Sequence, residues 1–148
     1  MDEASLHIDA APDALYDIVS DLPGMGRLSP ENTGATWIKG ATGPAVGARF
    51  RGGNKHGVMR WWTHGVITKA DRPKQIEWDV KESGTRWGYR FEPAGDGTLV
   101  TEYREHVKDV NPLIKLVQRS GLIGRQREPL MVEGMKETLQ RLKATVEA

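Results

Sequence analysis

The residues of this sequence that could do chemistry gather around one predicted strand. Glu102 and Arg104 stand two positions apart near the end of a β-like stretch, and His64 stands in an earlier one. A buried carboxyl group can bind the polar head of a ligand, and beside a histidine or an arginine it can act as an acid or a base. Glu102, His64 and Arg104 are therefore the candidate catalytic residues, with Tyr89 as a further acid–base group. A solvated face or a satisfied ion pair is the alternative.

The register of the strand over 99–107 decides whether these groups point inward. Side chains alternate between the two faces of a strand, and a slip of one residue exchanges the whole set. An inward Val100 places Glu102, Arg104 and His106 in the interior. An inward Leu99 instead places Thr101, Tyr103 and Glu105 there. The sequence leaves both registers open.

Motifs of several large enzyme classes are absent from the sequence. It has no G-x-S-x-G nucleophile elbow, no H-E-x-x-H zinc motif and no Walker loop. The four histidines lack the spacing of metal ligands, and there is no cysteine. We therefore expect no metal site and no cofactor.

Length and charge narrow the possibilities further. A chain of 148 residues is expected to form one domain over 1–148. The formal net charge is +1, whereas nucleic-acid-binding proteins usually carry a clear basic excess, so we expect no nucleic acid partner. No apolar run approaches the roughly 20 residues that span a bilayer, and the N-terminus lacks the pattern of a secretory signal. We expect a cytoplasmic protein without stable membrane insertion, either a monomer or a weak homodimer.

The order of the predicted elements indicates an α+β fold. A short strand over 5–9 precedes a helix that begins near Pro12 and a helical turn over 24–28. Six strands are predicted at 35–39, 48–53, 59–69, 75–81, 86–92 and 99–107. Their short, turn-like separators favour antiparallel hairpins. A helix from Asn111 and a longer one from Pro129 complete the chain.

The last helix has an apolar stripe that includes Met131, Met135, Leu139 and Leu142. A curved seven-stranded antiparallel sheet wrapped around this helix would bury the stripe. Aromatic side chains are expected on the inner face of that sheet. Period-two alternation places Trp78 on it in one strand, and Trp87, Tyr89 and Phe91 in the next.

The strand over 59–69 can be aligned in two ways. If Val66 and Ala70 face inward, Trp62 and His64 share their side and Trp61 points outward. A bulge would exchange Trp61 and Trp62.

Five segments, Ile8–Pro30, Gly47–Gly57, Arg60–Val80, Trp87–Glu105 and Met135–Glu147, together resemble the START-like, or helix-grip (SRPBCC), superfamily in its polyketide cyclase/dehydrase and lipid-transport branch. The resemblance covers essentially the whole chain. It rests on residues that mark turns and the ends of helices and strands, rather than on a catalytic signature. It implies a cavity between the sheet and the C-terminal helix that holds an apolar small molecule.

The leading functional prediction is the binding or transport of a lipid, a polyketide-like aromatic or an isoprenoid in that cavity. The predicted ligand-binding residues are Trp62, His64, Trp78, Trp87, Tyr89, Phe91, Glu102, Met131, Met135 and Leu139. Aromatase/cyclase-type catalysis on a polyketide in the same cavity is the alternative, and an interaction module is a third. The basic and apolar stretch over 119–127 is interpreted as a gate, as a membrane contact or as a solvated helix junction.

Overall fold

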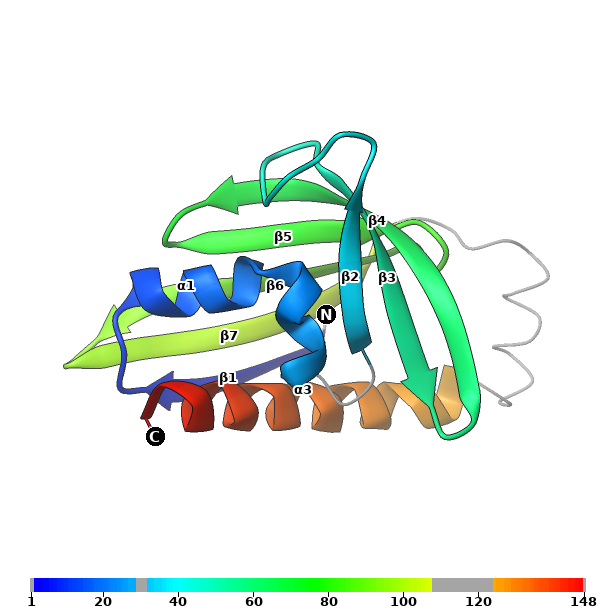
Figure 1. Cartoon of the computed structure of the whole chain (residues 1–148). Helices are drawn as coiled ribbons and strands as arrows, with labels where there is room; N and C mark the ends of the chain where they lie inside the picture. The colour runs from blue at the N-terminus through cyan, green and yellow to red at the C-terminus, as the bar shows by residue number, and fades with distance from the viewer. Residues whose placement is uncertain (1, 29–31, 108–123, 148) are drawn as a thin grey trace.

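The computed structural model describes residues 2–28, 32–107 and 124–147. The chain forms one antiparallel seven-stranded sheet with strand order β1-β7-β6-β5-β4-β3-β2, so every hairpin joins neighbours and β1 closes against β7 (Figure 1). The elements are β1 (Asp2–Ile8), α1 (Pro12–Ser20), η1 (Leu22–Arg27), β2 (Asn32–Ile38), β3 (Arg49–His56), β4 (Met59–Asp71), β5 (Gln75–Val80), β6 (Thr85–Ala94), β7 (Gly97–His106) and α3 (Gly124–Glu147).

The sheet, α1 and the long C-terminal helix confirm the predicted helix-grip α+β fold. Pro12 opens α1, where its missing N–H leaves no helical hydrogen bond unmade. α3 begins at Gly124 rather than at Pro129, so the proline lies inside the helix, where its missing N–H leaves one helical hydrogen bond unmade. The predicted helix from Asn111 and residues 119–123 of the predicted gate lie outside the described residues.

The β3–β4 hairpin is longer than the sequence predicts. Residues 54–57 are predicted as a turn, but β3 continues to His56, which pairs with Met59. The connection is therefore Gly57 and Val58 alone. A two-residue hairpin loop requires a positive φ, and Gly57 supplies it with a φ of 61°.

The inner face of the sheet, the one that α1 and α3 cover, settles the register of β7. Glu102 lies opposite Ala4 of β1 and Tyr89 of β6. Val100 on the same face is fully buried in the core. The register that places Val100, Glu102 and Arg104 inward is therefore the one that the protein adopts, while His106 on the same parity is exposed at the strand end.

The face assignment of β4 is the reverse of the one based on Val66. The pairing with β5 shifts between Ile67 and Lys69, so a bulge changes the alternation within the strand. Ile67 and Ala70 consequently both contact the core. Between the β3–β4 turn and the bulge, Trp61 therefore lies on the same inner face as Ile67, and Trp62 lies on the outer face.

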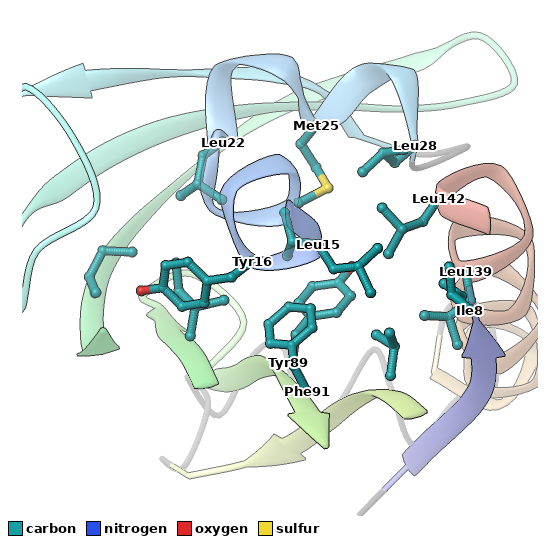
Figure 2. Packing of buried hydrophobic residues seen from close by; sticks show 14 of the residues in the cluster. Ile8, Leu15, Tyr16, Leu22, Met25, Leu28, Tyr89, Phe91, Leu139 and Leu142 are labelled. Carbon is teal, nitrogen blue, oxygen red and sulfur yellow. The ribbon is translucent and has the colours of Figure 1, made fainter. Parts of the chain in front are cut away.

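The core lies between the inner face of the sheet and the two helices. α1 lies over β5 and β6, and α3 runs along β1 (Figure 1). Figure 2 shows Leu15 and Tyr16 of α1 above the rings of β6, with Leu139 and Leu142 of α3 beside Ile8. Within the described residues, no helix is long and apolar enough to cross a membrane.

Candidate functional site

Glu102 is a carboxyl group enclosed in the apolar interior. Its residue is only 4% exposed, between Ala4 and Tyr89 on the inner face. The hydroxyl of Tyr89 donates a hydrogen bond of 2.7 Å to Oε2 of Glu102. The other oxygen, Oε1, is buried and has no hydrogen-bond partner among the described residues. Tyr89 thus holds one oxygen of this carboxyl group in place, and the other oxygen is left without a hydrogen bond by the described residues.

The surroundings of Glu102 favour its neutral form. Burial raises the pKa of Glu102 to about 8, and the hydrogen bond from Tyr89 offsets part of that rise. Burial also raises the pKa of Tyr89, and the nearby Glu102 raises it further. At neutral pH both groups therefore carry their protons. Because Tyr89 donates to Oε2, a proton on Oε1 makes that oxygen a donor to any acceptor placed beside it.

Arg104 lies two positions further along β7 and is engaged by its neighbours. Its Nη2 donates to Oδ2 of Asp2 at 2.7 Å, and its guanidinium lies 5.8 Å from the centre of the Trp87 ring. A charge-assisted bond to Asp2 and an aromatic contact fix the side chain. Arg104 therefore shares the inner face with Glu102, while its charge is balanced by Asp2.

A row of aromatic rings crosses the inner face beside Glu102. The ring of Trp78 lies 6.0 Å from Tyr89 and 6.3 Å from Phe50. Phe50 in turn contacts Trp37, and Tyr89 stacks on Phe91 at 6.4 Å. Large rings with a few buried polar groups beside them are typical of sites for apolar small molecules.

The predicted inner-face residues on β5, β6 and α3 lie on the interior side. Trp78 and Trp87 are half-buried and directly opposite one another. Phe91, Met135 and Leu139 are almost completely buried. Met131 belongs to α3, but its side chain lies outside the described residues.

The prediction that Trp62 and His64 face the interior is wrong. Trp62 is 60% exposed on the outer face, where Arg51 stacks on its ring. Nδ1 of His64 lies 2.6 Å from Oε2 of Glu82, also outside. The bulge in β4 accounts for both positions. His64 consequently cannot form an acid–base pair with Glu102 across the sheet.

The outer face carries a buried polar cluster that none of the sequence predictions includes. The hydroxyl of Tyr103 donates to Oε2 of Glu77, and Thr68 donates to Oε1 of the same carboxylate at 2.9 Å. Gln75 donates to the Tyr103 hydroxyl, and Nε of Arg86 lies 3.4 Å from Glu77. Both oxygens of Glu77 and the hydroxyl of Tyr103 have partners, which favours a role in stabilising the sheet. The sequence signal for this cluster is the alternation along β7, which places Tyr103 on the face of the sheet opposite to Glu102.

Two other features do not add to the site. An open depression of about 380 Å³ lies along the loop between β2 and β3 and is lined by residues 39–43, 45 and 47–49. β2 and β3 lie at one end of the strand order, whereas β7 lies next to the other end. In the part of the chain that the structure describes, no group of three or more histidine and acidic side chains could hold a metal ion.

Comparison with known proteins places these observations in a family. The sequence model of the family described as "Polyketide cyclase / dehydrase and lipid transport" matches residues 3–147. No curated protein matches the sequence.

Several solved structures have the same fold. A polyketide cyclase-like protein of Corynebacterium glutamicum, Cgl2372, is 27% identical with a TM-score of 0.66, covering 98% of this chain and 90% of its own. The protein TTHA0849 of Thermus thermophilus is 19% identical with a TM-score of 0.68, covering 96% and 93%. The two-domain aromatase/cyclase StfQ of the steffimycin biosynthetic pathway is 11% identical with a TM-score of 0.71; the match covers 98% of this chain and 44% of StfQ. With a family match over nearly its whole length, the chain belongs to the polyketide cyclase/dehydrase and lipid transport family.

Proposed function

We propose that the protein binds an apolar small molecule between the inner face of the sheet and α3, with Glu102 as the polar anchor. The candidate ligands are a lipid, a polyketide-like aromatic and an isoprenoid. The observation that carries the proposal is the buried Oε1 of Glu102, which has no hydrogen-bond partner among the described residues. Leaving such an atom unpaired costs about 1–3 kcal/mol, and a ligand oxygen would recover that free energy.

The protonation state of the anchor restricts the ligand. Since burial raises the pKa of Glu102 to about 8, Oε1 is a hydrogen-bond donor at neutral pH. The best partner is therefore a neutral acceptor, such as a carbonyl or hydroxyl oxygen. A cationic ligand would gain little from an uncharged carboxyl group.

The aromatic row supplies the apolar part of the binding energy. Trp78 and Trp87 are half-buried and can cover ligand surface, while Tyr89 and Phe91 are already packed in the core. At roughly 25 cal/mol per Å², a ligand that buries about 200 Å² of its surface gains about 5 kcal/mol before ordering costs. The single polar anchor then selects orientation more than it adds affinity.

The test is to equilibrate the protein with a whole-cell lipid extract and to identify what it retains by native mass spectrometry. Glu102→Leu removes the donor and should weaken binding of the retained molecule about tenfold. Glu92→Gln changes an exposed carboxyl group on β6 and serves as the matched control. If no extract yields a bound molecule, or if Glu102→Leu binds as tightly as the control, the proposal is wrong.

Aromatase/cyclase-type catalysis is the second candidate, and one observation favours it. A carboxyl group that keeps its proton at neutral pH, with Tyr89 bound to its second oxygen, can transfer that proton to a ligand carbonyl and so promote enolisation and loss of water. Turnover of a poly-β-ketone surrogate that Glu102→Gln abolishes, with an unchanged circular dichroism spectrum, would support catalysis. Binding without turnover would contradict catalysis and support only the binding function.

A further inference from the structure

The charges of this nearly neutral chain are strongly segregated. Residues 32–70 contain six lysine and arginine residues and no aspartate or glutamate, although the whole chain has a formal net charge of only +1. This segment comprises β2, β3 and most of β4, which form one edge of the sheet. A basic edge on a neutral protein requires a local explanation.

The cations concentrate on the outer face of the β3–β4 hairpin. On β3, the buried Phe50 points to the inner face. The alternate positions therefore point outward, and three of them are exposed cations: Arg49, Arg51 and Lys55. Arg60 on β4 is exposed and lies directly opposite Lys55. Like charges placed directly opposite in a sheet destabilise it.

Among the residues that the structure describes, no acidic side chain forms an ion pair with these four cations. On the outer face, Glu82 is bound to His64. His64 lies further from the hairpin turn than Trp62 does. Asp79 of β5 is held by Arg86.

The same hairpin exposes apolar side chains of the kind that enter a membrane interface. Val58 and Met59 at the turn are 99% and 55% exposed, and Trp62 is 60% exposed between the basic positions. The guanidinium of Arg51 stacks on the Trp62 ring, 4.7 Å from its centre. Tryptophan prefers the headgroup level of a bilayer, and aliphatic side chains prefer the acyl boundary below it.

We propose that the β3–β4 hairpin docks the protein onto an anionic lipid membrane, with Val58 and Met59 entering the interface and the cations contacting the headgroups (Figure 1, the hairpin turn at the lower right). Negative headgroups would neutralise the opposed Lys55 and Arg60, which form no ion pair with an acidic side chain among the described residues. An extended nucleic acid site would explain the cations and Trp62 but not the aliphatic turn. The docking surface uses no residue of the Glu102 site and stands independently of the proposed function.

The experiment is co-sedimentation of the full chain with phosphatidylcholine vesicles, with and without phosphatidylglycerol, at low and high salt. Binding should require phosphatidylglycerol and should weaken as salt screens the charges. Each cation near an anionic surface contributes about fivefold in affinity, so Lys55→Glu combined with Arg60→Glu should weaken binding by at least about 25-fold. Val58→Ser combined with Met59→Ser should weaken it while leaving the salt dependence in place.

The matched control is Lys74→Glu combined with Lys136→Glu, which changes the net charge equally at exposed lysines outside the hairpin. This control should keep most of the vesicle binding. A depth readout adds to it, because brominated lipids should quench Trp62 fluorescence and Trp62→Phe should lose that quenching. All hairpin variants should still bind the small molecule in a vesicle-free assay, which separates docking from the Glu102 site.

The proposal is overturned if the wild-type protein does not bind anionic vesicles at low salt. It is also overturned if the Lys74→Glu and Lys136→Glu control loses as much vesicle binding as the hairpin variants. It is equally overturned if a single-stranded oligonucleotide or an acidic protein binds the hairpin with the same variant dependence while vesicles do not.

Discussion

Tyr89 and Glu102 lie directly opposite one another on β6 and β7, and the tyrosine hydroxyl donates to only one of the two carboxyl oxygens, at 2.7 Å. The unshared oxygen is buried and, within the described residues, without a partner. This asymmetry leaves a carboxyl oxygen on the inner face of the sheet that makes no hydrogen bond within the described residues. Its proton has consequences for stability as well as for binding.

The free energy of unfolding should fall as the pH rises between about 4.5 and 8. Over that range Glu102 stays protonated in the folded protein, where burial raises its pKa to about 8, but ionises in the unfolded chain near its ordinary value of 4.5. The folded state then binds more protons, so higher pH favours unfolding, by up to about 1.4 kcal/mol per pH unit from this group. Urea unfolding of the wild-type protein and Glu102→Gln across this range measures the effect. The slope should be shallower in Glu102→Gln, and equal slopes would contradict the assignment.

Removing the hydroxyl of Tyr89 should raise the pKa of Glu102 above about 8. The hydrogen bond from Tyr89 lowers that pKa, so Tyr89→Phe leaves burial unopposed. The loss of one hydrogen bond, with Oε2 left buried, should also cost about 1–3 kcal/mol of stability. Carbon-detected NMR titration of the Glu102 carboxyl reports the pKa directly. A downward shift in Tyr89→Phe would show that the two groups are not coupled as described.

Gly65 should not tolerate a side chain. A Cβ at this position would lie 2.3 Å from Cζ of Phe50, the buried aromatic residue opposite it on β3. The ring is packed between Trp37 and Trp78, so Gly65→Ala should destabilise the protein by about 1–3 kcal/mol. Gly43→Ala, where a Cβ meets nothing within 4 Å, is the control and should change stability by less than about 0.5 kcal/mol. Thermal unfolding distinguishes the two, and equal Tm values would contradict the packing.

Lys55→Glu should stabilise the isolated protein while it weakens membrane docking. The new carboxylate would face Arg60 across the hairpin, replacing a repulsive pair with an attractive one. Cross-strand pairs of this kind contribute about 0.2–1 kcal/mol, or roughly 0.5–4 °C in Tm for a chain of this size. Calorimetry without vesicles tests it, with Lys55→Gln expected to show a smaller gain. A lower Tm for Lys55→Glu would mean that the two cations do not repel one another.

The fold can be predicted from the sequence because its signals are local and consistent. Period-two alternation, short turn-like separators and the apolar stripe of the last helix all favour the same sheet and helix, and the family resemblance agrees with them. Boundaries are less accurate where a turn is compact, as at Gly57, since the polar and glycine residues before it are typical of a loop.

The site depends on non-local pairing that the sequence does not encode in any one segment. Glu102 faces inward because β7 is registered against both β1 and β6, and either parity of β7 is plausible alone. A bulge after Ile67 places Trp62 outside, and no turn residue marks it. The charge segregation over 32–70 is visible in the sequence, but as an absence of acids, which a search for basic clusters overlooks.

The aromatic row gives the interior its own optical reporter. Trp78 has ring neighbours on both sides, Phe50 and Tyr89, and the second of these is bonded to Glu102. A ligand bound beside the carboxyl group, as proposed, would therefore change the polarity around an indole that is native to the chain. Binding of the proposed ligand would thus be read from the near-ultraviolet absorption and emission of Trp78, without any added label.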